Sequence, residues 1–202
     1  MSQALPELLV AITGASGSIY GLRLIERASP LVEQVLVVVS HAGAQVLAHE
    51  RKAPFDLDRP SLRPFLSREL PNVRFLHPDD LFASCASGSS APAAMVVAPC
   101  TMGTVGRIAA GTAEDLIGRA ADVMLKERRK LVLVPRETPL SLIHLRNLVA
   151  VTEAGALVLP ACPGFYHHPA SVVEMVDFVV GRVLDQLGLP NAQQRWGSEA
   201  EC

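Results

Sequence analysis

Aromatic side chains are scarce in this sequence: they make up 4% of its 202 residues, although half of all residues are hydrophobic. A hydrophobic core must therefore be built mainly from valine, leucine, isoleucine and alanine. That composition is typical of a parallel sheet buried on both faces by helices. The chain length suits a single domain with one core.

An excess of charge of one sign is also missing, because the formal net charge is only −2. Such a chain has no global field that would hold a nucleic acid, and we expect no nucleic-acid binding. Any anion that the protein binds must be held by a local group of cations.

Long hydrophobic runs and cysteine pairs are absent as well. The first apolar run, Leu8–Ile12, is far too short to cross a bilayer, and residues 1–7 lack the basic start of a targeting signal. The four cysteines form no C-x-x-C pair, and His167 and His168 have no acidic or cysteine partners at metal spacing. We expect no membrane segment, no metal site and a reducing, cytoplasmic location.

Short apolar runs alternate with helical patterns along the whole chain, which predicts βαβ units and the α/β class. The expected strands are Leu8–Thr13, Val35–Ser40, Val73–Leu76, Ala94–Ala98, Leu131–Val134 and Ala156–Leu159. The expected helices are Ile19–Arg27, Ala42–Glu50, Val105–Gly111, Glu114–Glu127, Leu140–Val151 and Ser171–Leu187. Arg51–Pro71, rich in proline and charge, is expected to be a surface excursion with one short helix.

These elements predict a doubly wound, mainly parallel sheet of the Rossmann-like or flavodoxin-like kind, in three αβα layers. We expect one domain over residues 1–202, with a core over about residues 8–189 and a polar tail over 190–202 that packs on a neighbouring subunit. In such a sheet, ligands collect beyond the carboxyl ends of the strands.

A glycine-rich loop, Gly14-Ala15-Ser16-Gly17-Ser18, follows the first expected strand. Its backbone N–H groups and the positive end of the following helix could cradle a phosphate. A tight turn in which Ser16 or Ser18 caps the helix explains the same pattern. The loop is not a dinucleotide fingerprint, and both interpretations stay open at this point.

A second polar loop, Thr101-Met102-Gly103-Thr104, follows the buried strand Ala94–Ala98. Two hydroxyls around a glycine suit a mononucleotide phosphate or the edge of a flavin, and helix capping would use the same residues.

Four basic side chains could form a local site for an anion. Arg119 and Lys126 are two helical turns apart and share a face, and Arg136 and Arg182 come from other elements. Together they could bind a phosphate or pyrophosphate through charge-assisted hydrogen bonds. Each of them alone would more simply be a solvated surface residue.

The sequence resembles the flavin prenyltransferase (UbiX-type) family from about Leu8 to Leu189. The resemblance is carried by four blocks: Ile12–Gly21, Arg119–Leu140 (interrupted after Arg129), Pro163–Pro169 and Arg182–Gln186. It implies that reduced FMN is a substrate and that dimethylallyl phosphate donates the prenyl group. The product would be prenylated FMN, the cofactor of UbiD-type (de)carboxylases. It also implies a homododecamer with active sites shared between subunits.

The resemblance assigns site residues position by position. FMN contacts would come from Gly14, Ala15, Ser16, Ser40, Thr101, Met102, Gly103, Thr104 and Arg136. The prenyl donor would be held by Tyr166, Arg182, Lys126 and Arg119, and the loop Ser87-Gly88-Ser89 would close over the ligands. Relatives often carry a tryptophan shortly before this loop, where this chain has Leu81 or Phe82.

The implied chemistry needs cations for the departing phosphate and groups that move protons. The flavin N5 would capture the allyl cation, and closure onto C6 would remove one proton and deliver another. We expect Glu137 and Ser16, with Glu50 less directly, to carry these transfers. The alternatives are an FMN-dependent cysteine-type or aromatic-acid decarboxylase of the same fold group.

Overall fold

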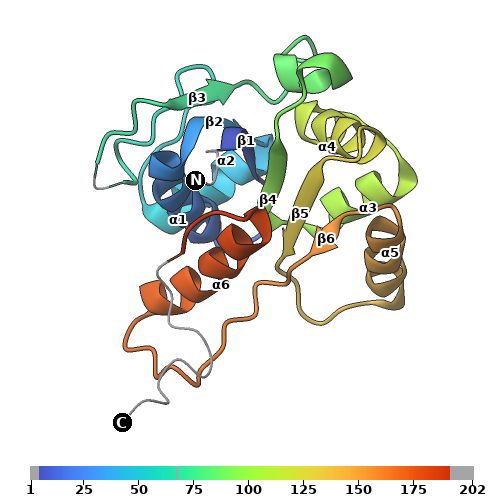
Figure 1. Ribbon diagram of the computed structural model, residues 1–202. Helices are drawn as coiled ribbons and strands as arrows, with labels where there is room; N and C mark the ends of the chain where they lie inside the picture. The colour runs from blue at the N-terminus through green and yellow to red at the C-terminus, as the bar shows by residue number, and fades with distance from the viewer. Residues whose placement is uncertain (1–4, 67, 192–202) are drawn as a thin grey trace.

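The computed structural model describes residues 5–66 and 68–191, which form a central parallel sheet with helices on both faces (Figure 1). The strands are β1 (Leu5–Ile12), β2 (Val32–Val39), β3 (Val73–Leu76), β4 (Ala94–Cys100), β5 (Lys130–Pro135) and β6 (Leu157–Val158). Their order is β3-β2-β1-β4-β5-β6, and every neighbouring pair is parallel. The predicted α/β class and doubly wound sheet are confirmed.

The sheet is buried on both faces by two separate hydrophobic clusters. Helices α1 (Ser18–Ala28), α2 (His41–Arg51) and α6 (Val172–Leu187) pack on one face. Helices α3 (Met102–Ala110), α4 (Leu116–Lys126) and α5 (Leu142–Glu153) pack on the other. Val, Leu, Ile and Ala supply most of both clusters, as the scarcity of aromatic residues predicts.

The chain reverses its direction of travel across the sheet between β1 and β4. From β1 it winds outward to β3, and from β4 it winds the other way to β6 (Figure 1). The loops that follow β1 and β4 therefore diverge at the carboxyl edge and leave a crevice there, where sheets of this kind bind their ligands.

Helix α1 lies unusually close to β4. A Cβ atom on Gly21 would meet the backbone oxygen of Ala98 and would lie 2.6 Å from the Ile12 Cγ1 atom. Only glycine permits this approach, so the position of the first turn of α1 depends on it.

The excursion between α2 and β3 differs from the prediction in two ways. The short helix expected there does not form within the described residues, which run as turns and bends. The segment is also not merely surface: Leu62 and Phe65 are buried, and Phe55 packs its ring 6.0 Å from those of Phe65 and Phe75. Prolines prevent a regular element, while the apolar residues between them still bury against the sheet.

In the described part of the chain, no helix combines the length and apolar character that a bilayer-spanning helix needs.

Candidate active site

The loops that follow β1 and β4 are joined by hydrogen bonds of one threonine, Thr13. The Thr13 hydroxyl donates to the Pro99 carbonyl oxygen at 2.8 Å and accepts from the Thr101 backbone N–H at 2.9 Å. Thr13 is 3% exposed, so these hydrogen bonds are shielded from water. They fix the start of the Gly14 loop against the start of α3.

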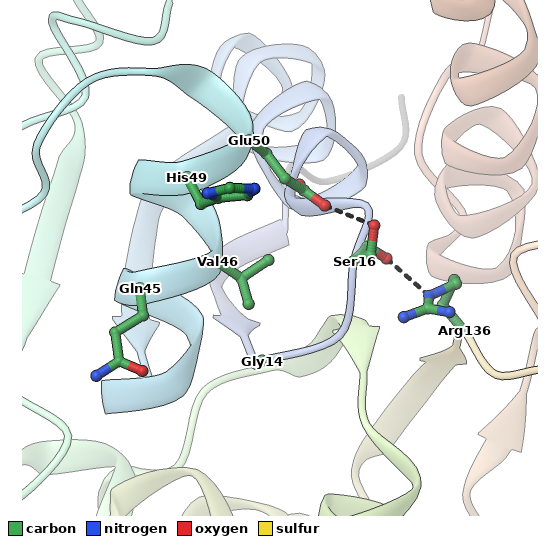
Figure 2. A pocket seen from close by; sticks show the side chains of 7 residues that line it. All are labelled: Gly14, Ser16, Gln45, Val46, His49, Glu50 and Arg136. Carbon is green, nitrogen blue, oxygen red and sulfur yellow. Dashed lines mark hydrogen bonds between the residues drawn. The ribbon is translucent and has the colours of Figure 1, made fainter.

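A pocket of ≈ 750 Å³ opens beside the Gly14 loop. Figure 2 shows its lining residues, which come from that loop, from one face of α2 and from the loop after β5. They are Gly14, Ser16, Gln45, Val46, His49, Glu50 and Arg136. The volume lies in the usual range for small-molecule and cofactor sites.

Glu50 is the most heavily hydrogen-bonded side chain of this pocket. Its Oε1 atom accepts from the Ser16 hydroxyl at 2.6 Å and from the Gly17 N–H at 2.8 Å. Its Oε2 atom accepts from the Ser18 hydroxyl at 2.6 Å and from the Ser18 N–H at 2.8 Å. Burial raises the pKa of Glu50, but these four hydrogen bonds outweigh it and hold the pKa below its ordinary value.

The start of α1 is therefore capped by an acid from another helix. Gly17, at φ 104°, is the N-cap residue and makes no side-chain capping bond. Of the two interpretations left open for this loop, capping of α1 by Ser16 or Ser18 does not occur, because both hydroxyls donate to Glu50 instead. A carboxylate at the positive end of a helix is stabilising. Here the Glu50 carboxylate occupies the N–H groups that could otherwise bind a phosphate.

The predicted loop Thr101–Thr104 is the start of helix α3: Met102, Gly103 and Thr104 form its first turn. Thr101 is the N-cap of α3, and its hydroxyl oxygen accepts from the Thr104 N–H at 3.0 Å. The Thr104 hydroxyl lies 2.9 Å from that of Thr101 and accepts from the Arg107 guanidinium at 3.2 Å. Met102 is buried and Gly103 is exposed. Unlike the start of α1, this helix start is not occupied by a carboxylate, and the Arg107 guanidinium lies beside it.

Arg136 and Ser40 frame the same crevice. The Arg136 Nε donates to the Ser16 carbonyl oxygen at 3.0 Å (Figure 2). The Ser40 hydroxyl caps α2 by accepting from the Gly43 N–H at 2.9 Å. Glu137 follows Arg136, is exposed, and accepts from the Thr138 N–H at 3.0 Å.

A second group of predicted residues gathers on α4. The Arg119 Nε donates to the Ala86 carbonyl oxygen at 3.1 Å, just before the loop Ser87-Gly88-Ser89. Lys126 pairs with Glu127 at 2.6 Å, and a Cβ on Gly88 would meet both of their charged groups. The Ser-Gly-Ser loop and the two predicted phosphate ligands on α4 are thus neighbours.

A third group lies on the face of α6. Tyr166 packs edge-on against Phe178, with ring centroids 5.9 Å apart, and Phe178 and Arg182 line one groove of ≈ 450 Å³ beside β6. Arg182 also pairs with Asp185 at 3.0 Å.

The four basic side chains that could form one anion site, Arg119, Lys126, Arg136 and Arg182, do not gather at one place within a single chain. Arg136 alone contacts the Gly14 loop through a described hydrogen bond. Helices α4 and α6 cover opposite faces of the sheet. Moreover, Lys126 ends a helix that leads into the start of β5, so it lies at the amino edge, away from the crevice. Arg119 and Lys126 do lie on one helix, as the spacing predicts, but the spacing does not say toward which edge of the sheet that helix runs.

Several pocket residues were not predicted. Gln45, Val46 and His49 line the pocket with Glu50. Helical spacing back from Glu50 would have found Val46, four positions earlier, but neither Gln45 nor His49. Ser18 and Thr13 act through contacts with residues more than 30 positions away, for which a single sequence carries no signal.

Comparisons with known proteins agree with this geometry. The family model described as Flavoprotein matches residues 2–184. The flavin prenyltransferase UbiX of Pseudomonas aeruginosa is 45% identical over 197 residues, covering 95% of this chain and 94% of the relative. The UbiX flavin prenyltransferase of Methanothermobacter thermautotrophicus is 44% identical over 190 residues, covering 94% of each.

Solved structures are similar along the same length. AnUbiX (PadA1), solved with FMN and dimethylallyl pyrophosphate, superimposes with a TM-score of 0.81 at 39% identity, covering 95% of this chain and 97% of that one. A dodecameric structure from Escherichia coli O157:H7, described as an FMN-dependent UbiX-like decarboxylase, gives a TM-score of 0.81 at 41% identity, covering 94% and 98%. The chain belongs to the flavoprotein family and, within it, to the UbiX-type flavin prenyltransferases.

Proposed function

We propose that this protein transfers a dimethylallyl group from dimethylallyl phosphate to reduced FMN, at N5 and C6, and releases prenylated FMN. The observation that carries the proposal is the Ser16–Glu50 pair in a pocket at the switch point of the sheet. Its family supports the same activity, since the relatives at 40–45% identity are named flavin prenyltransferases.

The residues present suit a flavin mononucleotide. The pocket of ≈ 750 Å³ is large enough for a flavin ring system and is open at the crevice. Hydroxyls at Thr101 and Thr104, the start of α3 and the nearby Arg107 offer donors for the phosphate group. Arg136 and Ser40 would complete the flavin contacts. The start of α1 is not available for the phosphate, because Glu50 fills it.

Reduced FMN supplies a nucleophilic nitrogen and an adjacent ring carbon, and the protein must handle the protons. Because the Ser16 hydroxyl donates its hydrogen to Glu50, its oxygen presents lone pairs to the pocket. It is thereby oriented to accept a proton from the flavin while its own hydroxyl proton passes to Glu50, so that the serine stays neutral. We assign the other proton transfer of ring closure to Glu137, which is exposed just after β5 and follows the pocket residue Arg136 in the chain.

The departing phosphate needs cations, and we infer that a neighbouring subunit supplies part of them. The described pocket is lined by neither Arg119 nor Lys126, nor by any residue of the Ser-Gly-Ser loop of the same chain. Large apolar side chains on α5 are exposed, with Leu142 at 61% and Ile143 at 67%, as expected of a surface that another subunit covers. A homododecamer, as described for the relative from Escherichia coli, would bring such groups together.

The further parts of the proposal follow from this activity. Residues 1–202 would act as one flavoprotein domain in the cytoplasm, without a metal. The groove that holds Phe178 and Arg182 would receive the prenyl donor, with Tyr166 beside it. A UbiD-type decarboxylase would take up the product.

One assay separates the candidates. The protein is incubated anaerobically with reduced FMN and dimethylallyl phosphate, and the flavin is then analysed by mass spectrometry. A gain of one C5H8 unit supports the proposal, and an unchanged flavin contradicts it. Two structures at 41% and 37% identity carry decarboxylase descriptions, so parallel samples contain a cysteine-terminated peptide or an aromatic acid instead. Release of carbon dioxide there would favour a decarboxylase.

A further inference from the structure

The Glu50 carboxylate is a saturated acceptor. Each of its two oxygens receives one hydroxyl and one backbone N–H, all at 2.6–2.8 Å. Three of these donors come from the first turn of α1 and its N-cap, and the fourth is the Ser16 hydroxyl. The carboxylate is thus held in one orientation, and of its four donors only the Ser16 hydroxyl belongs to a residue that lines the pocket.

The two serines that contact Glu50 differ in their access to the pocket. Ser16 is exposed and lines it, whereas Ser18 is completely buried and does not. A substrate can reach the Ser16 oxygen, but it cannot reach the Ser18 oxygen. The Ser18 hydroxyl therefore affects the pocket only through the carboxylate that it contacts.

We propose that Ser18 is a positioning residue for the transfer: its buried hydroxyl fixes the Glu50 carboxylate as an ionised acceptor and so orients the Ser16 hydroxyl toward the flavin. The proposal rests on the proposed function in naming the flavin as the group that Ser16 meets. The positioning of Glu50 itself does not depend on that function.

Charge around the carboxylate favours the ionised state. The start of α1 presents its positive end to Glu50, and two N–H groups of that turn point at it. The other titratable or charged groups that face this region are His49 on α2, Tyr20 on α1 and Arg136 from the loop after β5. Within the described residues, no cation forms an ion pair with Glu50, so hydrogen bonds carry most of its stabilisation.

The test compares Ser18→Ala with Ser18→Thr, which keeps the hydroxyl. Glutamate labelled with carbon-13 is incorporated into the flavin-free protein, the Glu50 carboxyl signal is assigned with Glu50→Gln, and its titration is followed by NMR. With one donor removed, Glu50 should titrate at higher pH in Ser18→Ala and as in the parent in Ser18→Thr. This readout needs no catalysis, so it stands even if prenyl transfer were not the reaction.

Kinetics provide the second readout. In Ser18→Ala the acid limb of the kcat profile should move to higher pH, with the rate reduced on the order of tenfold on that limb and the KM for FMN unchanged. Ser29→Ala is the matched control, because Ser29 is also a buried serine whose hydroxyl bonds to a side chain, that of Asn72. Its profile should match the parent's. An unshifted titration in Ser18→Ala, or equal losses in the Ala and Thr variants, would overturn the proposal.

Discussion

Thr13 and Thr101 lie 88 positions apart in the sequence, yet the Thr101 N–H donates to the Thr13 hydroxyl oxygen at 2.9 Å. Together with the bond from the Thr13 hydroxyl to the Pro99 carbonyl oxygen, this contact ties the loop after β1 to the loop after β4, where the candidate active site opens. It makes the shape of the crevice depend on one hydroxyl.

Thr13→Val should therefore weaken both the fold and the site. The change leaves the Thr101 N–H without its acceptor, which costs about 1–3 kcal/mol when the group is shielded from water. The free energy of unfolding, measured with urea, should fall by this amount, and the Kd for FMN should rise. Thr152→Val, which removes an exposed hydroxyl that bonds within α5, is the control and should change neither quantity appreciably.

Acid should destabilise the protein partly through Glu50. Its folded-state pKa lies below the ordinary 4.5, so its stabilisation is complete above that value and is lost as pH falls through the folded pKa. The difference in unfolding free energy between the parent and Glu50→Gln should be largest near neutral pH and should shrink in acid. A difference that grows on acidification would contradict the assigned direction.

Glu137→Gln should leave FMN binding intact and slow formation of prenylated FMN by on the order of 10²-fold or more, as expected for loss of a proton-transfer group. Binding is followed by flavin fluorescence and product by mass. Glu153→Gln, at the end of α5 and remote from the crevice, is the control. Unchanged turnover in Glu137→Gln would remove this residue from the mechanism.

Shared active sites can be tested by complementation. Arg136→Ala and Lys126→Ala should each be inactive alone. If one site uses Arg136 from one subunit and Lys126 from another, co-expression of the two variants should restore about one site in four by random mixing. Failure to recover activity in oligomers verified to contain both variants would place the two cations in the same subunit's site.

Cysteine reactivity should follow burial. Burial raises the pKa of the Cys85 thiol to about 11 and that of Cys100 to about 12, although Arg107 partly opposes the latter. Cys162 is exposed. Among these three, iodoacetamide at pH 8 should modify Cys162 in the native protein and all of them after denaturation. Peptide mass spectrometry reads the outcome, and native labelling of Cys100 would contradict the buried assignment.

The fold was predictable because burial on two faces leaves a clear trace in sequence. Val35–Ser40 and Leu131–Val134 are continuous β-branched or leucine runs, and both correspond to observed strands within three residues at each end. For the Thr101–Thr104 segment the sequence left a ligand loop and helix capping open, because a threonine followed by small residues fits both, and the structure shows that Thr101 caps α3.

The site was harder to predict, since its contacts join distant segments. The hydroxyls of Ser16 and Ser18 look like helix caps to any local rule, but an acceptor more than 30 positions away takes both. Arg119 and Lys126 share a helix face as expected, while their edge of the sheet depends on the direction in which α4 runs. Local patterns do not contain this information.

The close packing of Gly21 against β4 means that a residue outside the crevice influences the geometry of the crevice. Even one methyl group there would push the helix axis outward from the Ala98 backbone and tilt its first turn. The Gly17 and Ser18 N–H groups that donate to Glu50 lie at that turn. A substitution of Gly21, which contacts no ligand, would therefore weaken the hydrogen bonds that hold the Glu50 carboxylate. Substitution of Gly21 should thus lower catalysis by displacing the first turn of α1, without removing any group that takes part in the reaction.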